Sequence, residues 1–234
     1  MGANMARRLK DQGFTIAAVY DINLEAARSL ALELGCEAAT ELKLVTQLSD
    51  VIITVVTDDK AMKGIYLGGL LQRSRGKLFI NCATISPAVH VWVGQKAEKA
   101  GAQALEACMA SSITQAREGT LYLMCGGSEE AFNRAKPILE KLSASMRYIG
   151  PAGKAAQVKA LVNMVMNINT TGSDCPSKIG RGMNVGGMGK KDFMFLFPCR
   201  ISRCPFCRFP QKKGESQKNG VRRISSFIFL IPSF

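Results

Sequence analysis

The chain has 234 residues, 47% hydrophobic and 21% charged, proportions that are ordinary for a globular protein large enough to bury a sizeable core. Its longest apolar runs fall far short of the roughly 18–20 residues that a membrane-spanning helix requires. Arg7 and Arg8 are not followed by the apolar region of a secretory signal. We therefore expect no membrane span. Because eight cysteines occur without such a signal, we also expect a reducing, cytoplasmic location.

The charge is unevenly distributed. Residues 1–172 hold 19 Lys and Arg against 15 Asp and Glu, whereas residues 173–234 hold 12 against 3. Eight of the 11 phenylalanines and five of the eight prolines also lie in this second part. Such a shift in composition marks a boundary. We therefore expect a basic, disordered tail over residues 171–234, without a helical or strand period.

Before that boundary, helical patterns alternate with short apolar strands. Helices are expected over Met1–Asp11, Leu24–Leu34, onward from Pro87, Glu129–Leu142 and Ala155–Ile168, the second, third and fourth capped by Asn23, Ser86 and Ser128. Strands are expected over Phe14–Tyr20, Val51–Val56, Lys77–Ile80, Gln103–Ala107, Leu121–Cys125 and Met146–Ile149. This alternation predicts a doubly wound α/β domain with a parallel sheet, which binds ligands at the carboxyl ends of its strands.

Asp21 is the first residue with a chemical meaning, because it ends an apolar strand that follows a helix. In a dinucleotide-binding fold, an acidic residue there accepts hydrogen bonds from the ribose 2′-hydroxyl and repels a 2′-phosphate. That interpretation favours NAD over NADP. The alternative is an aspartate that caps the next helix.

Lys159 and Asn163 are four residues apart in the last helical pattern, so they share one face. A lysine aimed into a cleft can exchange a proton with a hydroxyl or carbonyl group when burial lowers its pKa. An asparagine beside it can hold the substrate. Taken without context, a solvated lysine on a surface helix is the simpler interpretation.

Five segments in order carry a family resemblance. They are Met1–Ala6, Val19–Asp21, Asn81–Pro87, Glu106–Ser112 with Gly119–Leu121 and Gly126–Gly127, and Gly150–Gly153 with Lys159–Asn163. Together they resemble the β-hydroxyacid dehydrogenase family, whose members include 3-hydroxyisobutyrate dehydrogenase and whose first domain is like the NADP-binding domain of 6-phosphogluconate dehydrogenase. The first segment looks like the end of the family's Gly-x-Gly-x-Met-Gly-x-x-Met-Ala, and the last like its Gly-x-x-Gly and Lys-x-x-x-Asn motifs.

The resemblance implies a Rossmann-type dinucleotide-binding domain over residues 1–150 and an interdomain-type helix over residues 151–170. It implies hydride transfer between NAD, with NADP as the alternative, and a short 3-hydroxy acid or semialdehyde. Lys159 would be the general acid and base, and Asn163 would orient the substrate. The cofactor-binding residues would be Gly2, Asn4, Met5, Asp21 and Thr84.

The sequence also departs from this family. Gly2 alone remains of the three fingerprint glycines, and the first strand is missing, which would leave the strands Phe14–Tyr20 and Val51–Val56 with unpaired inner edges. Ala110 replaces the serine of the substrate loop, so Ser111 and Ser112 would have to bind the substrate instead. We therefore expect an N-terminally truncated, impaired enzyme. The alternative is a non-catalytic binding or interaction module.

The tail has three further features that bear on function. Cys199, Cys204 and Cys207 contain a Cys-x-x-Cys but lack a fourth ligand, so we assign no metal site. The basic residues come without a nucleic-acid-binding motif, so we expect no nucleic-acid partner. The resemblance implies a small hydroxy acid or aldehyde as the partner, and it is compatible with a homo-oligomer. Phe227–Ile231 is interpreted as an aggregation or degradation signal rather than an anchor.

Overall fold

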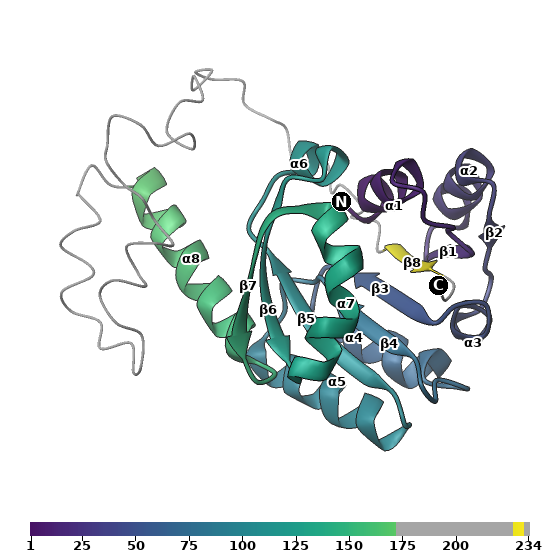
Figure 1. Cartoon of the computed structure of the whole chain (residues 1–234). Helices are drawn as coiled ribbons and strands as arrows, with labels where there is room; N and C mark the ends of the chain where they lie inside the picture. The colour runs from purple at the N-terminus through teal and green to yellow at the C-terminus, as the bar shows by residue number, and fades with distance from the viewer. Residues whose placement is uncertain (172–226, 232–234) are drawn as a thin grey trace. The chain divides into compact units, whose positions relative to one another are not determined.

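The computed structural model describes residues 1–171 and 227–231. Its centre is a sheet of eight strands in the order β2-β1-β8-β3-β4-β5-β6-β7 (Figure 1). The strands are β1 (Ala18–Asp21), β2 (Glu37–Ala38), β3 (Val51–Val55), β4 (Leu78–Asn81), β5 (Gln103–Met109), β6 (Leu121–Gly127), β7 (Ser143–Gly150) and β8 (Phe227–Ile231). The first six positions reproduce the doubly wound order 3-2-1-4-5-6, with β8 in the place of strand 1. The predicted fold class is therefore confirmed.

Helices cover both faces of the sheet. One face packs against α1 (Gly2–Asp11), α2 (Leu24–Leu34), α6 (Ile113–Glu118) and α7 (Glu129–Leu142). The other packs against α3 (Leu42–Gln47), α4 (Asp59–Ile65), the π-helical turn η1 (Tyr66–Leu70) and α5 (Pro87–Lys99). The last described helix is α8 (Lys154–Thr171). Within the described residues, no helix is both long and apolar enough to cross a membrane.

The strands divide their side chains between two apolar cores, because successive residues of a strand face opposite sides. In β3, Ile53 belongs to the core beneath α1 and α7, and Ile52 belongs to the core beneath α4 and α5; neither side chain is exposed. In β4, Leu78 and Ile80 join the first core and Phe79 the second. Because the sheet is buried on both faces, its strands have continuous apolar sequences.

Most of the predicted local signals are confirmed. Asn23 accepts a hydrogen bond from the Ala26 amide at 3.3 Å and so caps α2, which ends at Gly35 in the left-handed conformation (φ 64°). Ser128 caps α7 in the same way. Ser86 does not, since its side chain makes no cap bond; its amide donates instead to Asp59 Oδ1 at 2.8 Å.

Two predictions need correction. The strand expected over Phe14–Tyr20 begins only at Ala18. Residues after 172 were expected to lack strands, yet Phe227–Ile231 form β8, which pairs with β1 and β3. The inner edges of β1 and β3 are therefore paired. The remaining tail, 172–226 and 232–234, with Cys199, Cys204 and Cys207, lies outside the described residues.

Candidate active site

The carboxyl ends of the parallel strands lie at one edge of the sheet, and four of the nine predicted site residues lie at or after these ends. Asp21 ends β1. Thr84 follows the end of β4 and is exposed, while Ser111 follows the end of β5. The pairing of β4 with both β3 and β5 is parallel, which places these ends together.

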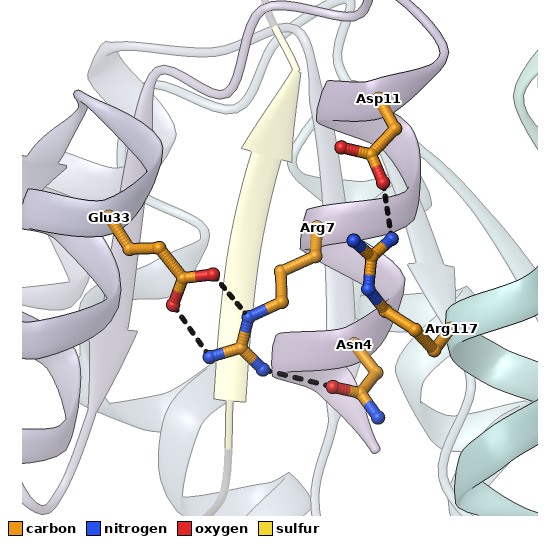
Figure 2. A network of polar contacts seen from close by, with 5 residues as sticks. All are labelled: Asn4, Arg7, Asp11, Glu33 and Arg117. Atoms are coloured by element: carbon orange, nitrogen blue, oxygen red, sulfur yellow. Dashed lines mark hydrogen bonds and ion pairs between the residues drawn. The ribbon is translucent and has the colours of Figure 1, made fainter.

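The first turn of α1 is held by a polar network (Figure 2). Arg7 makes a two-pronged ion pair with Glu33 of α2, with N···O distances of 2.6 and 2.7 Å, and also donates to Asn4 Oδ1 at 2.9 Å. Arg117 of α6 pairs with Asp11 at the other end of α1. Because these groups are partly exposed, we infer that the network orients α1 more than it stabilises the fold.

The three predicted cofactor residues on α1 have different surroundings. Gly2 is the first residue of the helix, where backbone N–H groups lack intrahelical partners. Asn4 is engaged, since its Nδ2 donates to the Ile113 carbonyl at 3.2 Å in addition to the contact with Arg7. Met5 has no exposed surface and lies in the core. Gly2 and Asn4 thus mark the helix N-terminus, and Met5 anchors the helix to the sheet.

The Asp21 carboxylate is fully buried. Its Oδ1 accepts from the Asn23 amide at 2.7 Å, whereas its Oδ2 has no hydrogen-bond partner among the described residues. Burial raises the pKa of Asp21, and the Asn23 amide opposes that shift. Asn23 and not Asp21 therefore caps α2, while one oxygen of Asp21 stabilises the turn before that helix. The ribose role of Asp21 stays a prediction.

Ser111 and Ser112 are both bound to nearby backbone. Ser111 Oγ accepts from the Tyr122 amide at 2.8 Å. Ser112 begins α6 with a capping box, in which its Oγ accepts from the Gln115 amide at 3.3 Å and Gln115 Oε1 accepts from the Ser112 amide at 2.8 Å. Both hydroxyls therefore serve local structure in this arrangement.

Lys159 is 8% exposed, which contradicts the simpler interpretation of a solvated lysine on a surface helix. Burial lowers the pKa of the Lys159 ammonium, and neighbouring Cys108 of β5 opposes the shift. Asn163 lies one helical turn later in α8 and is half-buried. The interpretation of Lys159 as a solvated surface residue is wrong because the start of α8 is fixed against the sheet.

Glu106 of β5, which sequence reasoning did not single out, provides that fixing. It is 3% exposed, and its Oε1 accepts from the Ala155 amide at 2.9 Å, at the first turn of α8. Burial raises the pKa of Glu106, while the amides of Ala155, Gly153 and Ala156 oppose the shift. A carboxylate at a helix N-terminus satisfies its free N–H groups and its dipole. Glu106 therefore clamps α8 one turn before Lys159.

His90, Glu106 and Cys108 form a buried cluster. His90 Nδ1 lies 3.6 Å from Glu106 Oε2, and His90 Nε2 lies 3.9 Å from Cys108 Sγ. Their ligand atoms all lie within 4.8 Å of one another, but they provide three donors, one fewer than a structural zinc site uses. Burial lowers the pKa of His90 to about 4, so at neutral pH the His90–Glu106 contact is not an ion pair. The alternation of Glu106 and Cys108 in the strand was the available sequence signal.

A doubly wound sheet with a helix N-terminus and an acidic strand end at its carboxyl edge defines the class of dinucleotide-binding α/β proteins. A family described as the NAD binding domain of 6-phosphogluconate dehydrogenase matches residues 1–150. The chain belongs to this family, which confirms the expected resemblance and the expected class of cofactor.

The relatives share the same fold and sequence pattern. The chain is 32% identical over 176 residues to a 3-hydroxyisobutyrate dehydrogenase of Pseudomonas aeruginosa, covering 74% of this chain and 58% of the relative. It is 29% identical over 210 residues to the mitochondrial 3-hydroxyisobutyrate dehydrogenase of Mus musculus, covering 87% and 60%. The chain thus spans about three fifths of the length of the curated relatives it matches.

Solved structures of related proteins have a similar fold. A Mycobacterium tuberculosis 3-hydroxyisobutyrate dehydrogenase, solved with L-serine, has a TM-score of 0.66 at 29% identity, covering 72% of this chain and 57% of its own. An imine reductase from Myxococcus stipitatus in complex with NAD+ has a TM-score of 0.68 at 20% identity, covering 84% and 67%. At that identity, the second likeness shows the fold alone.

The first prediction concerns the space beside Gly126 that the Glu106 carboxylate occupies. A Cβ at Gly126 would lie 2.0 Å from Glu106 Oε1, so Gly126→Ala should lower the free energy of unfolding by about 1–3 kcal/mol. In a Glu106→Ala background the clash is absent. There, the loss in free energy of unfolding caused by Gly126→Ala should be smaller by at least about 1 kcal/mol than in the parent chain. Urea unfolding of the four proteins in this cycle measures the difference.

The matched control is Gly64→Ala. Gly64 is exposed in α4 with nothing within 4 Å of an added Cβ, so alanine there should leave the stability equal or raise it by up to about 1 kcal/mol. If the losses in free energy of unfolding from Gly126→Ala and Glu106→Ala are additive, the close contact between Gly126 and the Glu106 carboxylate is contradicted.

The second prediction concerns pH. His90 is the one histidine in the sequence, and its pKa falls from 6.5 to about 4 in the fold. Between these values the unfolded chain binds more protons than the folded chain, so stability falls as pH drops from 6.5 towards 4. Between pH 7 and 5 the loss from this residue should be about 2 kcal/mol.

Two measurements test this. The single imidazole resonance in NMR should not titrate between pH 8 and pH 5.5. In urea unfolding, His90→Gln should lose less stability on acidification than the parent chain. A resonance that titrates near pH 6.5 would refute the burial-driven shift.

Proposed function

We propose that this chain is part of an NAD-dependent oxidoreductase that transfers a hydride between the nicotinamide and a short 3-hydroxy acid or semialdehyde, with NADP as the alternative cofactor. Family membership supports an NAD-binding domain. The single observation that supports catalysis is Lys159, a buried lysine whose pKa is lowered and whose helix is clamped to β5 by Glu106.

The residues at the carboxyl edge fit a dinucleotide. Asp21 Oδ2, which has no hydrogen-bond partner among the described residues, is a buried acceptor suited to a ribose hydroxyl, and the N-terminus of α1 at Gly2 suits a phosphate. Thr84 presents an exposed hydroxyl at the end of β4, on the nicotinamide side in this proposal. When bound, the nicotinamide accepts or supplies the hydride.

In this proposal, Lys159 accepts the proton of the reacting hydroxyl during oxidation. Its lowered pKa increases the fraction of neutral amine near neutral pH, which is the form that accepts a proton during oxidation. The same group returns the proton during reduction. Asn163, one turn further along α8, orients the substrate or the amine.

We further propose that activity is reduced. Ala110 occupies the position of the substrate-loop serine, and the Ser111 and Ser112 hydroxyls are held by local backbone hydrogen bonds. The same observations favour the second candidate, a non-catalytic dinucleotide-binding module. Turnover of 3-hydroxyisobutyrate with NAD by the purified chain distinguishes the two.

The third prediction compares two lysines of α8. Lys159→Gln should lower kcat by at least about 100-fold, because a positioned acid–base group contributes roughly 10²–10⁴-fold. Lys154→Gln should leave kcat unchanged, since Lys154 is exposed and its ammonium donates to Gln157 Oε1 at 3.4 Å, away from Glu106 and Lys159. The parent kcat/KM for oxidation should rise with pH through a pKa below the usual lysine range.

Steady-state kinetics with NAD and 3-hydroxyisobutyrate provide both readouts. Equal losses in the two variants would show that the charge of α8, and not the proton of Lys159, matters. If the parent chain binds NADH but shows no turnover, the binding-module candidate is correct.

The fourth prediction concerns cofactor choice. Asp21→Asn keeps an acceptor for the Asn23 amide but removes the charge of Oδ2, so the ratio of NADH to NADPH affinity should fall roughly tenfold. Asp58→Asn is the control, because Asp58 follows β3, caps α4 through the Ala61 amide at 2.8 Å and is exposed. NADH and NADPH fluorescence titrations measure the ratio. An unchanged ratio for Asp21→Asn would exclude the ribose role.

A further inference from the structure

The position between β1 and β3 is filled from the far end of the chain. Residues Phe227–Phe229 of β8 pair with Val19–Asp21 of β1, and all five residues of β8 pair with Val51–Val55 of β3. Both pairings are antiparallel, whereas β3 and β4 are parallel. Figure 1 shows β8 as the yellow strand between the purple β1 and the blue β3.

Without β8, this position would be an open slot one strand wide. Neighbouring strands lie about 4.8 Å apart, so β1 and β3, each one strand from β8, are too far apart to pair directly. Val19, Ile52 and Ile53 have no exposed surface, so the slot runs through the core. Unpaired backbone N–H and C=O groups there would be buried without partners, which folded proteins rarely tolerate.

The sequence of β8 suits this slot. Phe-Ile-Phe-Leu-Ile is apolar at every position and rich in residues with high strand propensity. A strand covered on both faces requires such an uninterrupted apolar run. Helix α1 contacts β8 as well, so the strand is enclosed by a helix in addition to its two neighbours.

We propose that the slot between β1 and β3 is a strand-acceptor site, that its occupant is the chain's own segment Phe227–Ile231, and that this insertion completes the dinucleotide-binding sheet. The segment that composition identified as an aggregation signal is then a folding element. The stability of residues 1–164 depends on a strand that follows α8 by more than fifty residues.

The fifth prediction tests the pairing in the full chain. Phe229→Pro removes a backbone N–H in the middle of β8, opposite Val19 and Ile53, and should lower the melting temperature. It should also speed amide hydrogen exchange of β1 and β3 at least tenfold. The matched control, Phe229→Val, keeps the N–H and the strand propensity and should keep most of the protection.

Hydrogen exchange followed by mass spectrometry measures the amide exchange rates of peptides that cover residues 18–21 and 51–55. If Phe229→Pro folds and leaves their exchange unchanged, β8 does not occupy the slot. If instead Phe229→Pro is insoluble, a cross-link in an otherwise native chain decides the question.

For the cross-link, Val55→Cys is combined with Phe227→Cys, since these residues are paired in the register. The control combines Val55→Cys with Ile228→Cys, one position out of register. We expect a disulfide within one chain for the first pair only, identified by mass spectrometry and by a monomer on a non-reducing gel. The same disulfide between two chains would show that a second copy is the occupant, and no selective disulfide would exclude the pairing.

Discussion

An inner strand of a sheet that is covered on both faces needs hydrogen-bond partners on both edges, because its backbone is screened from water. In this chain that requirement falls on β1 and β3, which are buried between two apolar cores and meet only through β8. The arrangement of the other elements depends on it. Helix α1, whose N-terminus faces the candidate cofactor edge, packs on β8, and β2 extends the sheet from β1.

The same need for satisfied backbone groups positions Lys159, the proposed acid–base group. The first N–H groups of α8 have no intrahelical acceptors, and a buried carboxylate of β5 provides one. Gly126 on β6 leaves the space that Glu106 requires, so three elements meet at one carboxylate. Since Lys159 lies one turn beyond this contact, its burial and lowered pKa follow from the position of Glu106 on its strand.

The signals readable from the sequence were those whose physics is local. The Asn23 cap with Gly35, the Ser128 cap and the apolar run of β3 each depend on a few neighbouring residues, and all three are confirmed. The site itself depends on distant contacts. Glu106 gains its role only when α8 packs on β5, and Phe227–Ile231 becomes a strand only when β1 and β3 leave a slot. An apolar segment has the same composition whether it aggregates or completes a sheet, so composition alone could not distinguish these outcomes.

Asp21 is the residue at which the sheet and the candidate cofactor site meet. Its backbone pairs with Phe227 of β8. One oxygen of its side chain is bound to the Asn23 amide, and the other has no partner within the part of the chain that the structure describes. Because β8 runs antiparallel to β1, its first residue lies at the edge where the parallel strands end. A parallel strand in that position would place its last residue there and lead directly into a helix N-terminus. Strand β8 therefore provides the pairing between β1 and β3 without providing a strand-to-helix turn at that edge. In the proposed function, phosphate binding at that edge would then depend on the start of α1.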